Sequence, residues 1–284
     1  MGLETSVDFA ARYASFLTAA HASFPKAKIR LPTLWQKLRG KRLRKPWREV
    51  LDAALSQAGD GDGVILEFGV HKGYSIRHMA ARRPGAVLHG FDSFQGFPAD
   101  QRPDWHQDFA LPAVPVVSEN VRLHVGYFEE TLPRFVAGCD GVRPALTLVH
   151  IDCDIFSSTQ TVLLELEPWL GPGDVLVFDE LMNYAEFAVN EFLALFLFLE
   201  RTGLDFEWLA TWGKAYPWAQ SQGLLPAWGF DAYRAAGYFQ NQAIRLIPRA
   251  AGGHFDGPAA GSATVDRLEQ AVAAVKLPDG RALW

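Results

Sequence analysis

Val64-Ile-Leu-Glu-Phe-Gly-Val-His-Lys-Gly73 joins an apolar run to a turn that holds two glycines four residues apart, and a helical pattern begins near Tyr74 and Ser75. The run lacks the alternation of a half-exposed strand, so it predicts a strand that is buried on both faces of a parallel sheet. Glycines at such a turn let the backbone approach a ligand closely, and the first N–H groups of the following helix have no helical partners. An ordinary strand-to-helix connection has the same pattern, so the turn alone leaves both interpretations open.

The alternation of strand and helix continues outward from this turn. Further apolar runs lie at 86–91, 121–128, 146–151 and 174–178, and helical patterns lie between them at 75–82, 129–136 and 158–170. This order predicts an α/β protein with a doubly wound, mostly parallel sheet and helices on both faces. Beyond it we expect a long helix at 183–201 and an antiparallel strand pair at 206–212 and 243–248, at the edge of the sheet.

Helical additions are expected at both ends of this unit. Residues 7–22 and 47–58 have helical patterns, and a Gly/Ala-rich loop precedes a short terminal helix. The expected organisation is an N-terminal helical and basic extension, a central domain, and a C-terminal loop with a short helix, at residues 1–58, 59–248 and 249–284 respectively.

Composition and charge limit the class of protein. The 284 residues include 49% hydrophobic side chains, enough for a large core, and the net charge of −5 is too small for bulk attraction to nucleic acid or to a membrane. The charge is uneven, because residues 26–48 hold ten Lys or Arg and no Asp or Glu. The chain has two cysteines, Cys139 and Cys153, and no apolar run long enough to span a bilayer, so we expect a cytoplasmic protein.

An acidic residue follows the second apolar run. Asp92 lies nineteen residues after Gly73, where it can accept hydrogen bonds from ribose hydroxyls, although an aspartate at this junction can also cap a helix. The spacing Glu67-x-Gly69-x-x-x-Gly73 lacks the Gly-x-Gly-x-x-Gly that lets a pyrophosphate pass closely. The pattern therefore favours an adenosyl ligand without phosphates over a nicotinamide dinucleotide.

Carboxylates gather after the fourth and fifth apolar runs, in His150-Ile-Asp-Cys-Asp154 and Phe178-Asp-Glu180. The carboxyl ends of parallel strands share one edge of a sheet, where packed carboxylates would repel each other unless a cation neutralised them. Mg²⁺ suits such a site because it accepts oxygen ligands completed by water and substrate. His150 is expected to be a hydrogen-bonded core histidine and Asp154 a helix cap, and capping stays an alternative for the other aspartates.

Five blocks occur in order along the chain. They are Glu67-Phe-Gly-Val-His-Lys-Gly-Tyr-Ser75, Gly90-Phe-Asp-Ser-Phe-Gln-Gly-Phe-Pro98, Gly126-Tyr-Phe-Glu-Glu-Thr-Leu-Pro133, His150-Ile-Asp-Cys-Asp-Ile-Phe-Ser-Ser-Thr159 and Phe178-Asp-Glu180. Together they resemble the macrocin O-methyltransferase family, which belongs to the S-adenosylmethionine-dependent methyltransferases. The resemblance spans residues 60–248 and implies a Rossmann-like methyltransferase sheet.

The resemblance also implies a role for each matching residue. The methionine end of the cofactor would be lined by Glu67, Gly69, Gly73 and Ser75, its ribose would be bound by Asp92 and Ser93, and its adenine would be flanked by Tyr127 and Phe128. The ligands of Mg²⁺ would be Asp152, Asp179 and Glu180, and Asp152 would also be the base. Two positions depart from the family pattern, because the macrolide-sugar members have an aspartate in place of Glu180 and a glycine in place of Cys153.

The predicted reaction is methyl transfer from S-adenosylmethionine to a hydroxyl of a small molecule, with help from Mg²⁺. Family analogy favours a sugar or a glycosylated natural product as the acceptor. The loop 96–117 follows the predicted ribose site and is placed to act as a lid over the acceptor. Tyr216, Trp218 and Trp228 could stack on the acceptor, although aromatic residues at this density also build cores and interfaces.

Rival functions follow from the basic segment and from the fold. Residues 26–48, with Trp35 and Trp47, could grip an RNA backbone, which would make the chain an RNA methyltransferase. A non-catalytic protein that retains the methyltransferase fold is the second alternative. We instead expect the basic segment to dock on the acidic remainder or on a second subunit, with no nucleic-acid or membrane partner and with a homodimer as one outcome.

Overall fold

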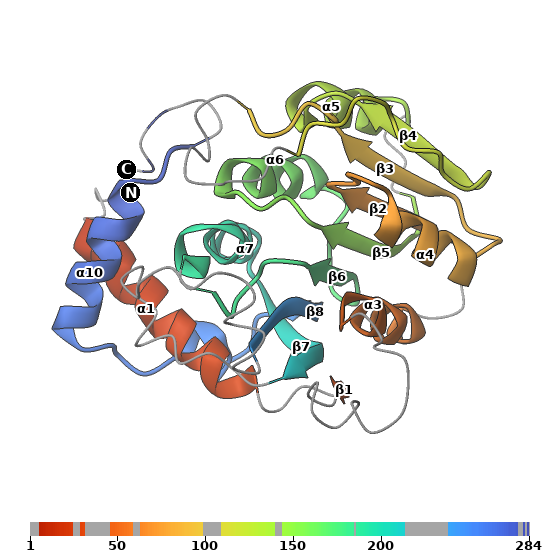
Figure 1. Ribbon diagram of the computed structural model, residues 1–284. Helices are drawn as coiled ribbons and strands as arrows, with labels where there is room; N and C mark the ends of the chain where they lie inside the picture. The colour runs from red at the N-terminus through yellow and green to blue at the C-terminus, as the bar shows by residue number, and fades with distance from the viewer. Residues whose placement is uncertain are drawn as a thin grey trace.

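The computed structural model describes residues 6–24, 29–31, 46–58, 63–98, 109–139, 144–184, 186–213, 238–277, 281 and 283. A sheet of eight strands lies at the centre (Figure 1). The strands are β1 (Ile29–Leu31), β2 (Val64–Phe68), β3 (Leu88–Asp92), β4 (Val121–Val125), β5 (Leu146–Ile151), β6 (Val175–Phe178), β7 (Leu204–Gly213) and β8 (Tyr238–Pro248). The helices are α1 (Ser6–Ser23), α3 (Pro46–Gln57), α4 (Tyr74–Arg82), α5 (Phe128–Ala137), α6 (Phe156–Leu166), α7 (Glu191–Thr202) and α10 (Ser262–Ala273), with 3₁₀ turns η2 (Phe187–Val189) and η3 (His254–Asp256).

The sheet has the doubly wound, mostly parallel arrangement that the sequence predicts. Its strand order is β1-β7-β8-β6-β5-β2-β3-β4, and the antiparallel pairs are those that β8 makes with β6 and β7. The chain runs outward from β2 to β3 and β4 and then returns to β5, on the other side of β2. Ligands of open α/β sheets bind at such a switch point, beyond the carboxyl ends of the strands.

Helices cover both faces of the sheet (Figure 1). On one face lie α5, α6 and α7, with α1 and α10 outside α7, and on the other face lie α3 and α4. Each face therefore has its own hydrophobic core, the first on the side of α5, α6 and α7 and the second on the side of α3 and α4. In β2, Leu66 belongs to the first core and its neighbour Ile65 to the second, and both are fully buried. Burial on both faces explains why the strands read as continuous apolar runs.

Both ends of the described chain contribute to the first core. The ring of Phe16 in α1 lies 5.1 Å from that of Phe196 in α7 and 4.8 Å from that of Phe255, which follows β8. Aromatic pairs at this spacing add specific packing to the area they bury. The predicted boundaries at residues 58 and 248 stay a prediction.

Three elements differ from the expectations. The helix expected at 183–201 begins only at Glu191, because the residue before it, Asn190, has a non-helical backbone conformation (φ −116°, ψ −128°). The antiparallel pair β7 and β8 forms as expected, but β8 lies inside the sheet, between β6 and β7. Inside the basic segment, Ile29–Leu31 form a parallel edge strand that the sequence did not predict.

Some predicted features lie outside the described residues. They include the central part of the predicted lid, at 99–108, the aromatic residues Tyr216, Trp218 and Trp228, and most of the basic segment 26–48. Among the described helices, none combines the length and the apolar character that crossing a bilayer requires.

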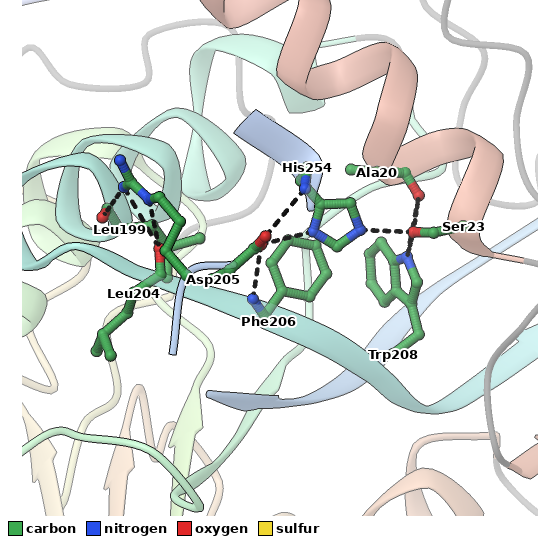
Figure 2. Close-up of polar contacts among 9 residues, drawn as sticks. Ala20, Ser23, Leu199, Leu204, Asp205, Phe206, Trp208 and His254 are labelled. Carbon is green, nitrogen blue, oxygen red and sulfur yellow. Dashed lines mark hydrogen bonds and ion pairs between the residues drawn. The ribbon is translucent and has the colours of Figure 1, made fainter. Parts of the chain in front are cut away.

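A polar network ties α1 and η3 to β7 (Figure 2). Asp205 on β7 lies 2.7 Å from the ring Nδ1 of His254 and accepts the backbone N–H of His254 at 2.9 Å. The other ring nitrogen of His254 contacts Ser23 Oγ at 2.7 Å. The Ser23 hydroxyl is also within hydrogen-bond distance of Ala20 O (2.8 Å) and of Trp208 Nε1 (3.0 Å). Because these partners enclose the hydroxyl, we assign the network a structural role.

We expect Asp205→Asn to lower the free energy of unfolding by about 3 kcal/mol at neutral pH, because it removes a buried charge that His254 needs as its partner. Burial by itself raises the pKa of Asp205, but hydrogen bonds from His254 and Phe206 outweigh it and hold the pKa below its usual value. The stabilisation is therefore complete above the unfolded pKa of about 3.9 and is lost as the pH falls through the folded pKa. Urea unfolding of both proteins at neutral and at acid pH measures the difference, which should shrink in acid.

Asp256→Asn is the matched control for this prediction. Asp256 is exposed in the same segment, where it accepts the backbone N–H of Gly252 at 2.7 Å. Its replacement should change the free energy of unfolding by less than about 1 kcal/mol. If the two variants lost the same free energy of unfolding, the buried pair of Asp205 and His254 would stabilise the protein no more than an exposed hydrogen bond does.

Candidate functional site

The glycine turn follows β2 directly. Gly69 has φ 91°, and Gly73, with φ 70°, is the N-cap of α4. A Cβ placed on Gly69 would lie 1.9 Å from the backbone oxygen of Asp152, so this turn touches the loop after β5 through the two backbones. The glycine is therefore required by a close approach, and the predicted cofactor turn lies beside the predicted base.

Glu67 is a fully buried carboxylate on β2. One of its oxygens accepts the hydroxyl of Ser75 at 3.0 Å, and the other lies 3.1 Å from Nδ1 of His150. The side chain thus joins the start of α4 to β5. The core position expected for His150 is confirmed, since the residue is 3% exposed.

Asp92 lies at the end of β3, and its two carboxylate oxygens accept the backbone N–H groups of His71 (2.7 Å) and Phe94 (2.6 Å). These bonds fix the plane of the carboxylate, and each oxygen retains a further lone pair for a ribose hydroxyl. No helix begins in the described residues directly after β3, so the helix-cap alternative for Asp92 is not realised. The Ser93 hydroxyl donates to Gly96 O (3.1 Å) and accepts the N–H of Gln95 (3.0 Å), which commits it to its own loop.

The start of α5 lies beside Asp92. Gly126 donates its N–H to the backbone oxygen of Asp92 at 3.0 Å, and Tyr127 is the half-buried N-cap of the helix. The Phe128 ring packs edge-on against Phe68 of β2, with 5.6 Å between the ring centroids. Phe128 is thus part of the core packing, and adenine contacts by Tyr127 and Phe128 stay a prediction.

A potential metal-binding group lies at the ends of β5 and β6. His150, Asp152 and Asp179 can each offer one ligand atom, with all of these atoms within 4.8 Å of one another. The neighbouring Glu180 is not in this group. It is 3% exposed, and its Oε1 accepts the side-chain amide of Gln240 at 3.2 Å.

Negative charge is concentrated around Asp152. Burial raises the pKa of Asp152 well above its usual range, and Asp179, Asp154, Glu191 and Glu180 raise it further. Carboxylates that raise each other's pKa in this way are stabilised by a cation. The expectation that Asp154 caps a helix is wrong, because α6 has Ile155 as its N-cap and no side-chain cap in the described chain, while Asp154 itself has φ 61°.

Glu191, the first residue of α7, is a site residue that sequence reasoning missed. It is fully buried, and its two oxygens accept the N–H groups of Cys153 and Glu180, both at 3.1 Å. These two residues directly follow Asp152 and Asp179, so Glu191 holds the two acidic loops together. Burial first, and then the charge of nearby carboxylates, raises the pKa of Glu191. A lone acid at the start of a long apolar run was the signal in the sequence.

Amide side chains of β8 were missed as well. Asn241 donates to Oδ1 of Asp179, Gln240 donates to Glu180, and the oxygen of Gln242 accepts the N–H of Met182 at 3.3 Å. The run Gln240–Gln242 interrupts an otherwise apolar strand, and this interruption could have indicated polar partners across the sheet.

Comparisons with known proteins show what the central part of the chain resembles. Residues 66–181 match a protein family described as a methyltransferase domain. A curated relative, the 8-demethyl-8-(2,3-dimethoxy-alpha-L-rhamnosyl)-tetracenomycin-C 4'-O-methyltransferase of Streptomyces olivaceus, is 27% identical over 155 residues, which are 46% of this chain and 56% of that protein. The chain thus spans little more than half the length of the curated relative it matches.

Solved structures are also similar. The calicheamicin methyltransferase CalS11 is 25% identical with a TM-score of 0.47, over 70% of this chain and 77% of that one. Cofactor-bound Rv0187 from MTB is 17% identical with a TM-score of 0.44, over 87% of this chain and 99% of that one. Residues 66–181 thus resemble a methyltransferase domain, and they lie within the doubly wound, Rossmann-like sheet.

Proposed function

We propose that the chain is an S-adenosylmethionine-dependent O-methyltransferase that acts on a hydroxyl of a small molecule. The observation that carries this proposal is the backbone contact between Gly69 and Asp152 inside the methyltransferase domain. It brings the turn suited to the cofactor next to the acids suited to the reaction.

The described residues fit the cofactor in two ways. The N-terminus of α4 has no side-chain cap in the described chain, so its N–H groups are suited to the methionine carboxylate. Asp92 is held by two backbone N–H groups in a fixed orientation for ribose hydroxyls.

Methyl transfer to an alcohol forms a C–O bond while the S–CH₃ bond of the sulfonium breaks, and the hydroxyl proton must go to a base. Asp152 is the proposed base because it lies beside the glycine turn. The products are the methyl ether, S-adenosylhomocysteine and a proton on Asp152.

The acids at the ends of β5 and β6 fit a divalent cation, since burial and mutual repulsion disfavour their ionised forms without one. When bound, Mg²⁺ would neutralise this charge and lower the pKa of a coordinated acceptor hydroxyl. Asp152, Asp179 and Glu180 are the residues predicted to hold it. Asn241 and Gln240 orient Asp179 and Glu180 by hydrogen bonds from β8.

A sugar hydroxyl, on a free sugar or on a glycosylated natural product, is the acceptor that we propose. The curated relative supports this, because its name describes a 4'-O-methyltransferase of a rhamnosyl tetracenomycin. The narrower resemblance to the macrocin O-methyltransferases points the same way. The rival RNA methyltransferase depends on the basic segment 26–48, most of which lies outside the described residues.

The proposed compartment is the cytoplasm, because Cys139 and Cys153 are both free thiols, as a reducing environment maintains them. A homodimer stays a prediction.

A calorimetric titration with S-adenosylmethionine, with and without Mg²⁺, tests the proposed function. We expect micromolar binding that Asp92→Ala weakens by about tenfold to a hundredfold, since it removes charge-assisted hydrogen bonds to the ribose. Asp266→Ala, the same change at an exposed position of α10, is the matched control and should bind as the wild type does. Absence of binding by the folded wild type would overturn the methyltransferase and favour the non-catalytic alternative.

A further inference from the structure

His150 offers a nitrogen ligand at the acidic site. It lies opposite Glu67 in the register of β5 with β2, and 3% of the residue is exposed. Its Nδ1 is 3.1 Å from the buried carboxylate of Glu67. A carboxylate in this position holds the proton on Nδ1 and leaves the lone pair on Nε2.

The second ring nitrogen of His150 is then available to the acids. Nε2 makes no hydrogen bond within the part of the chain that the structure describes, although the side chain is almost entirely buried. One ligand atom each from His150, Asp152 and Asp179 lie within 4.8 Å of one another. A histidine that gives one nitrogen to a carboxylate and the other to a cation is the usual arrangement in metal sites.

Glu180 lies outside the group of residues that can hold a metal ion together. Its Oε1 accepts the amide of Gln240 at 3.2 Å, and its backbone N–H is held by Glu191 at 3.1 Å. The side-chain contact connects Glu180 to β8. The group whose geometry suits a metal ion contains His150 instead of Glu180.

We propose that His150 binds the cation together with Asp152 and Asp179, so that the site takes a divalent transition-metal ion such as Mn²⁺ in preference to Mg²⁺. The proposal rests on the cation of the proposed function and changes both its ligands and its identity. The physical reason is that Mg²⁺ favours oxygen ligands almost exclusively, whereas an imidazole nitrogen favours transition metals.

The arrangement also connects the two halves of the site. Glu67 accepts the Ser75 hydroxyl with one oxygen and contacts His150 with the other. Ser75 belongs to the first turn of α4, where the cofactor is proposed to bind. The buried carboxylate of Glu67 therefore links the start of α4, where the cofactor is proposed to bind, to His150, the proposed metal ligand.

The test is a titration of the full chain with Mn²⁺, followed by calorimetry and by pulsed electron paramagnetic resonance. In the wild type we expect the nitrogen coupling of a metal-bound imidazole. His150→Gln should abolish this coupling and weaken Mn²⁺ binding by at least about a hundredfold, and it should reduce the preference for Mn²⁺ over Mg²⁺. Glu180→Gln, the matched removal of the alternative ligand, should weaken binding by less than about tenfold and keep the coupling.

Bound Mn²⁺ without nitrogen coupling in the wild type would overturn the proposal, and this measurement needs no variant to fold. The proposal would also be overturned, in favour of an all-carboxylate site, if Glu180→Gln lost Mn²⁺ binding while His150→Gln kept it. Failure of the wild type to bind Mn²⁺ would also overturn the proposal. The titration with S-adenosylmethionine in the absence of metal reports on the cofactor site separately, so failure of this proposal and failure of the proposed function give different results.

Discussion

Asp152→Asn should lower turnover by about a thousandfold while the affinity for S-adenosylmethionine changes by less than about threefold. The amide cannot take the proton of the acceptor hydroxyl, and it is a poorer ligand for a cation than a carboxylate. The cofactor turn meets Asp152 through backbone atoms, which the substitution leaves in place. Turnover measured with a sugar acceptor, beside a calorimetric titration of the cofactor, separates the two effects.

Asp154→Asn is the matched control for Asp152→Asn. It removes the same charge two residues away, and asparagine tolerates the left-handed conformation that Asp154 adopts (φ 61°). Asp154 is not in the group that can hold a cation, so we expect turnover to fall by less than about tenfold. Unchanged turnover in Asp152→Asn would remove this residue from the mechanism, and equal losses in both variants would reduce its role to general electrostatics.

Gly69→Ala should lower the free energy of unfolding by more than about 3 kcal/mol and weaken cofactor binding by at least about tenfold. The added Cβ would lie 1.9 Å from the backbone oxygen of Asp152, so one of the two loops must move. The positive φ of 91° adds strain for any residue with a Cβ. Thermal or urea unfolding and the cofactor titration measure the two effects on the same preparation.

Gly173→Ala isolates the contribution of backbone strain. Gly173 has φ 99°, close to that of Gly69, but a Cβ there would meet no atom within 4 Å. We expect a loss of about 1 to 2 kcal/mol and unchanged cofactor binding. If Gly69→Ala cost no more than Gly173→Ala, the close approach of the two loops would be irrelevant to the site.

The local pattern of the chain was enough to predict the central sheet. Apolar runs became β2 to β6 because their side chains are buried on both faces, as Ile65 and Leu66 illustrate. The glycine turn could be predicted because a positive φ at Gly69 and Gly73 is a local requirement. Where local signals were mixed, as at 183–201, the predicted helix was too long.

The acids illustrate what a pattern cannot supply. Their place at the ends of β5 and β6 follows from the alternation of strand and helix, and so Asp152 and Asp179 could be predicted to meet. Their partners could not be predicted, because Glu191 and Asn241 come from elements far along the chain. Such contacts depend on how helices and antiparallel strands pack, which no local period encodes.

By itself, the sequence determined the doubly wound sheet, the glycine turn, the place of Asp92 at the end of β3 and the convergence of carboxylates at one edge, since all of these follow from periodicity and turn chemistry within short segments. Only the tertiary structure decided which side chains complete the site. The register of β2 with β5 sets His150 opposite Glu67, and the start of α7 places Glu191 behind both acidic loops. Register and helix packing are fixed by burial across the whole core, and therefore only the folded chain reveals them.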